Sequence, residues 1–221
     1  MIHMPGLLNP AQVQRLRAIA ATGRFVDGRA TAATVTPGVK HNEQLEFSEA
    51  SVREMGEMLW AALLANADFQ LWAMPRTLRA PMINRHGPGM FYDRHVDAPW
   101  MHTQAGILRT DISMTIFLSP PDSYEGGALC IETANGECEI KLAPGDGFAY
   151  NTTVPHRVAK VTAGERLALV TWAQSIVRDP AQRAIIHQLS LAQRRALTLD
   201  QDLGDQLTQS LGNLLRMWMD G

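Results

Sequence analysis

Apolar residues recur every three to four positions at both ends of the chain, which is the spacing of an amphipathic helix. Near the start, Asn9 is a suitable N-cap and Pro10 a suitable first residue for a helix over residues 9–21. Further along, Ser48 or Ser51 can cap a second helix. The predicted helices cover residues 9–21, about 48–66, 68–73, and two segments after Pro180 that carry apolar stripes at 184–191 and 207–218.

Between residues 79 and 175 the pattern changes to apolar runs of four to eight residues, separated by Gly, Pro, Asn and Asp. Such spacing is typical of short antiparallel strands, and eight of them favour a barrel or a double-sheet jelly roll. Residues 27–42 show no clear period and are expected to be irregular or an edge strand. The predicted strands are 79–85, 91–97, 111–118, 127–132, 137–142, 147–150, 156–161 and 166–174.

One hairpin can be predicted in register, because Asn135-Gly136 is a strong two-residue turn signal. That turn pairs Ile131 with Ile140 and places Cys130 and Cys138 on opposite faces of the sheet, so we expect two free thiols, buried or half-buried.

Composition narrows the class of protein. The 221 residues are 46% hydrophobic and 19% charged with a formal net charge of -2, which argues against nucleic acid as a partner bound through its phosphates. Two cysteines, no signal-like start and no long apolar run predict a cytoplasmic protein without membrane contact. We expect an α+β protein with three parts, an N-terminal helical region at 1–76 that packs on the core, a β domain at 77–175 and a C-terminal helical region at 176–221.

Three residues have the chemistry of a metal site. His95 and Asp97 are two apart in a predicted strand and therefore share a face, and His156 begins a later strand. Two imidazoles and one carboxylate form the facial triad that holds Fe(II) with open positions. Alone, His95-Val96-Asp97 is a weak signal, since chance supplies about 0.4 such spacings in a chain of this composition.

A fourth residue adds an anion site. Arg166 begins the last predicted strand, where its guanidinium can bind a carboxylate bidentately. If the strands of His156 and Arg166 form a hairpin, both residues face one cavity only when the turn is odd or bulged, and a three-residue turn at 163–165 meets that condition.

Nearly the whole chain resembles the Fe(II)/2-oxoglutarate dioxygenases of the prolyl-4-hydroxylase-like class, and within it the bacterial PKHD-type hydroxylases. The resemblance is carried by PGLLNPAQV at 5–13, FYDRHVDAP at 91–99, RTDISMTIFLSPPDSYEGGALCI at 109–131 and LAPGDGFAYNTTVPHRVAKVTAGERLALVTWAQSIVRD at 142–179. It implies a double-stranded β-helix (jelly-roll) core flanked by the N-terminal and C-terminal helices.

The resemblance also implies roles for individual residues. His95, Asp97 and His156 would bind Fe(II), and Arg166 would bind the C5 carboxylate of the co-substrate 2-oxoglutarate. Where many relatives carry a tyrosine that also binds 2-oxoglutarate, this chain has His86, and we expect His86, Tyr92 or Asn84 to supply that contact. The implied reaction hydroxylates a small-molecule or peptide substrate and gives succinate and CO2, with L-ascorbate as reductant and a link to bacterial iron uptake.

Other functions remain open at this level. One is a non-catalytic cupin-like sensor that binds iron or a 2-oxoacid and acts through a protein partner. A zinc hydrolase would use the same three ligands but would give Arg166 no role. An AlkB-type demethylase is disfavoured because its second arginine position is Trp172 here. The apolar stripe at 207–218 is expected to serve core packing or a homo-oligomer interface.

Overall fold

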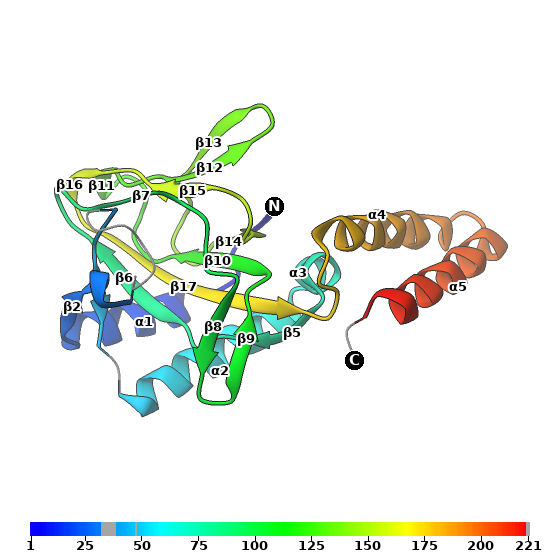
Figure 1. The fold of residues 1–221 in the computed structure, drawn as a ribbon, viewed down its shortest axis with the longest axis horizontal. Coiled ribbons are helices and arrows are strands. Elements are labelled where there is room, and N and C mark those ends of the chain that lie inside the picture. The colour runs from blue at the N-terminus through cyan, green and yellow to red at the C-terminus, as the bar shows by residue number, and fades with distance from the viewer. Residues whose placement is uncertain (32–38, 47, 220–221) are drawn as a thin grey trace.

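The computed structural model describes residues 1–31, 39–46 and 48–219. Its β-rich body has two main sheets, and helices cover one side (Figure 1). The helices are α1 Pro10–Thr22, α2 Glu49–Ala65, α3 Ala67–Ala73, α4 Pro180–Ala196 and α5 Gln201–Trp218, with a short 3-10 turn at Gly28–Thr31. The strands are β1 Ile2–Met4, β2 Phe25–Asp27, β3 Lys40–His41, β4 Glu43–Leu45, β5 Pro75–Leu78, β6 Met82–His86, β7 Phe91–His95, β8 Trp100–Thr103, β9 Gly106–Arg109, β10 Ile112–Phe117, β11 Tyr124–Gly126, β12 Leu129–Thr133, β13 Gly136–Ile140, β14 Gly147–Asn151, β15 His156–Val158, β16 Val161–Gly164 and β17 Arg166–Ser175.

The larger sheet has the order β1-β14-β10-β17-β6-β4-β2, with β5 paired to β17. The smaller sheet has the order β13-β12-β15-β7-β3 and lies on the side of the larger sheet opposite α1 and α2 (Figure 1). Two short two-stranded pairs, β11-β16 and β8-β9, complete the described strands. The strand order is not the chain order, so the sequence alone could not supply it.

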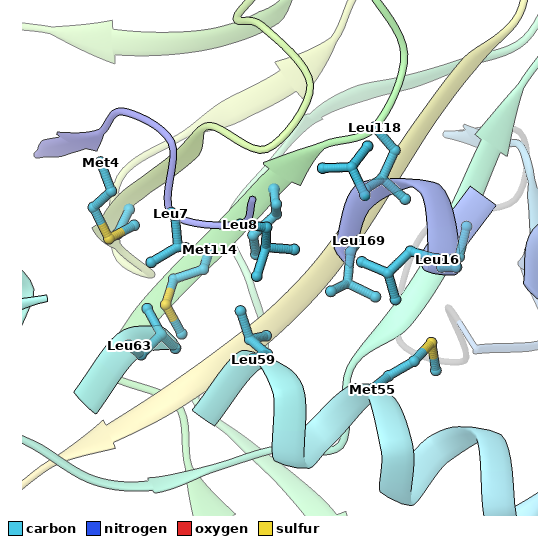
Figure 2. Packing of buried hydrophobic residues seen from close by; sticks show 14 of the residues in the cluster. Met4, Leu7, Leu8, Leu16, Met55, Leu59, Leu63, Met114, Leu118 and Leu169 are labelled. Atoms are coloured by element: carbon cyan, nitrogen blue, oxygen red, sulfur yellow. The ribbon is translucent and has the colours of Figure 1, made fainter. Parts of the chain in front are cut away.

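The main hydrophobic core lies between the larger sheet and the helices α1, α2 and α3. Figure 2 shows Leu16 of α1 and Leu59 of α2 pointing toward Leu169 of β17. Because side chains alternate along a strand, Leu167, Leu169 and Ala173 face this core while Arg166 faces the other way. β17 therefore carries two different environments on its two faces.

The predicted N-terminal helices are confirmed together with their caps. Asn9 accepts a hydrogen bond from the Gln12 amide at 2.9 Å, and the Gln12 side chain accepts one from the Asn9 amide at 2.9 Å. Ser48, rather than Ser51, caps α2 and accepts from the Ser51 amide at 3.2 Å. Capping depends on residues three positions apart, which is why the sequence pattern found it.

The predicted hairpin exists, but its register was wrong. Ile131 pairs with Cys138, and Thr133 pairs with Gly136, so the two-residue turn is Ala134-Asn135. A shift of two residues keeps every side chain on its predicted face. Cys130 and Cys138 are accordingly free, as predicted, but Cys138 is exposed because its part of β13 extends beyond the body of the protein.

Several strands were missed. β1, β2 and β4 join the larger sheet, and the segment predicted as a loop at 98–108 contains the β8-β9 hairpin. These strands are three or four residues long, too short to show a period of two. Residues 27–42 were expected to be irregular or an edge strand, and within them Lys40–His41 form β3 at the edge of the smaller sheet. Residues 32–38 lie outside the described residues.

The C-terminal helices α4 and α5 pack against each other and extend away from the sheets (Figure 1). Leu211, Leu215 and Trp218 of the predicted stripe pack with Val177 and Ile186, so the stripe serves core packing. In the part of the chain that the structure describes, no helix has the length and apolar character needed to cross a membrane.

Candidate functional site

His95, Asp97 and His156 meet in one cluster whose potential metal-binding atoms all lie within 4.8 Å of one another. The pairing of β7 with β15 explains this, because it places His95 directly opposite His156 and brings their ring centroids to 4.2 Å. Asp97 follows the end of β7, and its carboxylate oxygens lie 3.8 Å from His95 Nε2 and 3.7 Å from His156 Nε2. Two imidazoles and a carboxylate in this arrangement can hold a divalent metal ion.

Hydrogen bonds orient all three side chains toward the centre of the cluster. His95 Nδ1 lies 2.7 Å from the Asp93 carbonyl, and His156 Nδ1 lies 3.0 Å from the Val154 carbonyl. Each Nδ1 therefore carries the proton, and each Nε2 keeps its lone pair for a ligand bond. The Ser113 hydroxyl donates to Asp97 Oδ2 and fixes the carboxylate in the same way.

Burial keeps His95 in the state that a metal requires. Burial, reinforced by the neighbouring His156 ring, lowers the pKa of His95 to about 4, so its imidazole is neutral near pH 7. The ring of Tyr92 stacks on His95 with centroids 3.6 Å apart. Burial, reinforced by Asp97, also raises the pKa of Tyr92 to about 12, so Tyr92 retains its hydroxyl proton.

Arg166 lies in the same cavity as this cluster but makes no ion pair among the described residues. Its side chain is 2% exposed, its Nε has no hydrogen-bond acceptor, and its guanidinium lies 5.6 Å from the Phe117 ring centroid. Burial lowers the pKa of Arg166, because the charged form has lost its water. A buried arginine without an anion is costly in free energy, and an anionic ligand would remove that cost.

The expected route by which Arg166 reaches the cavity was wrong. The β15 and β17 strands do not form a hairpin, because β16 lies between them and pairs with β11. His156 belongs to the smaller sheet and Arg166 to the larger one, and the cavity lies between the two. The turn at 163–165 therefore does not decide which way Arg166 points.

The three residues expected to assist Arg166 also line this cavity. His86 pairs with Arg166 across β6 and β17 and is 1% exposed, with neither ring nitrogen hydrogen-bonded. Burial, followed by the charge of Arg166, lowers the pKa of His86 well below its ordinary value. Asn84 lies two residues before His86 in β6 and therefore on the same face of the strand. Its Oδ1 is buried and accepts no hydrogen bond from the described residues.

The cavity has a volume of about 1090 Å³ and opens beside the β8-β9 hairpin, which contributes Trp100, Met101 and His102. Arg109, at the end of this hairpin, is not among the described residues that line the cavity: its Nε donates to Asp111 Oδ1 at 2.8 Å. The segment after His95-Val96-Asp97 thus contributes residues that line the cavity, whereas Arg109 and Asp111, just before β10, form an ion pair with each other.

Sequence reasoning missed Ser113 and Tyr150 as residues of the site. Tyr150 is buried, and its ring lies edge-on to His156 with centroids 4.9 Å apart. Burial, followed by the charge of Asp97, raises the pKa of Tyr150 well above its ordinary value. Ser113 and Tyr150 pair with each other across β10 and β14, so the strand order was needed to place them beside Asp97.

Comparison with known proteins agrees with this geometry. Residues 81–174 match the family model of the 2OG-Fe(II) oxygenase superfamily. The chain is 42% identical over its full length to a PKHD-type hydroxylase of Maricaulis maris (strain MCS10), of which the match covers 99%. It is 40% identical to a PKHD-type hydroxylase of Burkholderia ambifaria, again over 100% of this chain and 99% of the relative.

Among solved structures, the fold is similar to a Pseudomonas putida prolyl-4-hydroxylase, with a TM-score of 0.53, 21% identity, and coverage of 79% of this chain and 91% of the other.

Proposed function

Because this chain belongs to the PKHD-type hydroxylases of the 2OG-Fe(II) oxygenase superfamily, and is thus a 2-oxoglutarate-dependent dioxygenase, we propose that the cavity between its sheets is the active site. There the enzyme hydroxylates a carbon of a small-molecule or peptide substrate. The overall reaction consumes 2-oxoglutarate and O2 and gives succinate, CO2 and the hydroxylated product. One oxygen atom of O2 enters succinate and the other enters the product. The single observation that carries the proposal is a buried Arg166, without an ion pair among the described residues, in one cavity with the His95, Asp97 and His156 cluster.

The three metal-binding side chains have the chemistry that Fe(II), the metal of this family, requires. His95, Asp97 and His156 would hold Fe(II), which supplies the open positions and the electrons that O2 activation needs. The fit rests on two Nε2 atoms, each on a ring whose Nδ1 is held by a backbone carbonyl, and on a carboxylate close to both. A structural zinc site would instead be closed by a fourth protein ligand.

We assign the binding of 2-oxoglutarate to residues of the larger sheet. Arg166 would bind the C5 carboxylate bidentately, and His86, whose nitrogens lack partners, would add a hydrogen bond beside it. Asn84 and Tyr92 are the other proposed contacts, and Tyr150 lines the same cavity. These residues bind and orient the co-substrate and keep water out, and none of them makes or breaks a bond.

Several finer assignments belong to the same proposal. The two facing sheets would form the double-stranded β-helix, with 77–175 as the dioxygenase domain, 1–76 as the N-terminal helical region packed on it and 176–221 as the C-terminal helical region. L-ascorbate would restore Fe(II) after uncoupled turnover. A homo-oligomer through α4 and α5, a cytoplasmic location and a link to bacterial iron uptake stay predictions.

An anaerobic titration tests the site directly. Metal-free protein receives Fe(II) and then 2-oxoglutarate, and we expect the weak visible charge-transfer band of a chelated Fe(II)-oxoacid complex. The band should weaken in Arg166→Ala at the same 2-oxoglutarate concentration. Folded protein that gives no band would overturn the proposal. Once the band is observed, succinate release serves to screen candidate substrates. No observation on the described residues favours the non-catalytic sensor.

A further inference from the structure

A second set of polar groups lies in the cavity around Trp172, and the chemistry above does not use it. Trp172 is six residues after Arg166 on the same face of β17, roughly 20 Å along the strand. Across β10 it pairs with Ser113, whose hydroxyl donates to Asp97. Trp172 therefore lies on the side of the metal cluster that is remote from the proposed 2-oxoglutarate carboxylate site.

Two N–H donors at this end of the cavity have no acceptor. Trp172 Nε1 and Arg79 Nε are both buried and make no hydrogen bond with any residue that the structure describes. The backbone fixes the two residues side by side, because the Arg79 amide donates to the Trp172 carbonyl at 2.8 Å. The Arg79 guanidinium lies 5.4 Å from the Trp172 ring centroid. Buried donors without acceptors are rare in native proteins, and a ligand is one way to satisfy them.

The charge at this end is positive. Arg79 makes no ion pair among the described residues, and burial alone lowers its pKa. Of the described residues that line the cavity, Asp97 is the only acid, and it belongs to the metal cluster. Arg94 also lines the cavity, but it is already bound through two hydrogen bonds to Glu132. Arg79 is thus a cation that an anionic ligand would match.

We propose that Arg79 and Trp172 bind a carboxylate of the prime substrate, so that this enzyme hydroxylates a small carboxylic acid. The inference rests on the proposed function, since it places the substrate beside the same cluster. A planar carboxylate has two acceptor oxygens for the two N–H groups and one negative charge for the guanidinium. The cavity of about 1090 Å³ exceeds the usual size of a pocket for one small ligand, roughly 300–1,000 Å³, so it has room for a second molecule.

Calorimetry on the anaerobic protein, saturated with Fe(II) and 2-oxoglutarate, tests the proposal with matched probes. The probes are N-acetyl-L-leucine with N-acetyl-L-leucinamide, 4-phenylbutyrate with 4-phenylbutanamide, and phenyl phosphate. Saturating 2-oxoglutarate keeps the acids away from Arg166. We expect the acid of at least one pair to bind about ten- to a hundredfold more tightly than its amide, the effect of one charge-assisted hydrogen-bonded contact.

The variants distinguish Arg79 from Arg94, another cation that lines the cavity. Arg79→Gln should abolish the preference for the acid, Arg79→Lys should keep part of it, and Trp172→Phe should reduce it by a few-fold. Arg94→Gln is the matched control, because Glu132 already neutralises Arg94, and it should keep the full preference.

Either of two results would overturn the proposal: no acid binds more tightly than its amide, or Arg79→Gln keeps the preference. Tighter binding of phenyl phosphate than of both acids would also overturn it in favour of a phosphate substrate. The visible band of the Fe(II)-2-oxoglutarate complex is recorded on every protein. Its absence from the wild type would refute the proposed function itself, whereas its presence without acid binding refutes the substrate class alone.

Discussion

The two faces of the larger sheet bury different kinds of side chain. On the side of α1 and α2, Leu16, Leu59 and Leu169 are each no more than 1% exposed and fill the space with apolar side chains (Figure 2). On the opposite face of the same strands, Arg166 and His86 are almost as deeply buried but have hydrogen-bonding atoms without partners. The helix-covered face is fully packed by the protein's own side chains. The cavity face has polar groups whose hydrogen bonds the proposed ligands would complete.

Within a single strand, the residues on one face therefore contribute to stability and those on the other to the proposed function. Burying apolar side chains contributes about 25 cal/mol per Å² of surface removed from water, so the helix side stabilises the fold. Burying polar groups without partners costs free energy, so the cavity side destabilises the empty protein. Substitutions on the two faces of β17 should therefore have opposite signatures.

The largest effect is expected at the metal cluster. His156→Ala removes one of three ligands, so Fe(II) binding and succinate formation should both be lost while the protein stays folded. Calorimetric Fe(II) titration and a succinate assay measure this. His187→Ala, on α4 and away from the cavity, is the control. Full turnover by His156→Ala would show that another residue is the third ligand.

On the helix side, Leu169→Ala should lower the free energy of unfolding by about 2–5 kcal/mol, the cost of a cavity in a packed core. Urea unfolding measures it, and the dissociation constant of 2-oxoglutarate for the folded protein should not change. Leu191→Ala, whose side chain is 47% exposed, should stay within about 0.5 kcal/mol of the wild type. A weakened binding of 2-oxoglutarate by folded Leu169→Ala would contradict the division between the faces.

On the cavity side, Arg166→Met should raise the dissociation constant of 2-oxoglutarate by about ten- to a hundredfold, because a charged hydrogen-bonded contact is lost. The metal-free protein should be as stable as the wild type or more stable, since the substitution removes a buried cation without an ion pair. Titration of the visible band and urea unfolding report the two quantities. Strong destabilisation would reveal a structural partner of Arg166.

The smallest effect is expected for Ser113→Ala. It removes the hydroxyl that fixes Asp97, and loss of such an orienting hydrogen bond lowers metal affinity by about tenfold. The Fe(II) titration is repeated on this variant. Ser119→Ala, which removes a buried hydroxyl bonded to the Glu165 carbonyl, should leave metal affinity unchanged. An unchanged affinity in Ser113→Ala would show that Asp97 is held by its backbone alone.

Local signals in the sequence determined the helices at both ends, their caps at Asn9 and Ser48, and most strands of the β region. They also identified His95, Asp97, His156 and Arg166, which the structure brings to one cavity. Residue type and spacing sufficed there, because capping and alternation act over two to four residues.

The tertiary structure decided how these pieces meet. Pairing of β7 with β15 put His95 opposite His156, and the two facing sheets, not a turn, brought Arg166 to them. The same pairings placed Ser113 beside Asp97 and Arg79 beside Trp172, residues 16 and 93 positions apart. Strand order depends on which distant segments bury their surfaces together, and no short stretch of sequence encodes that choice.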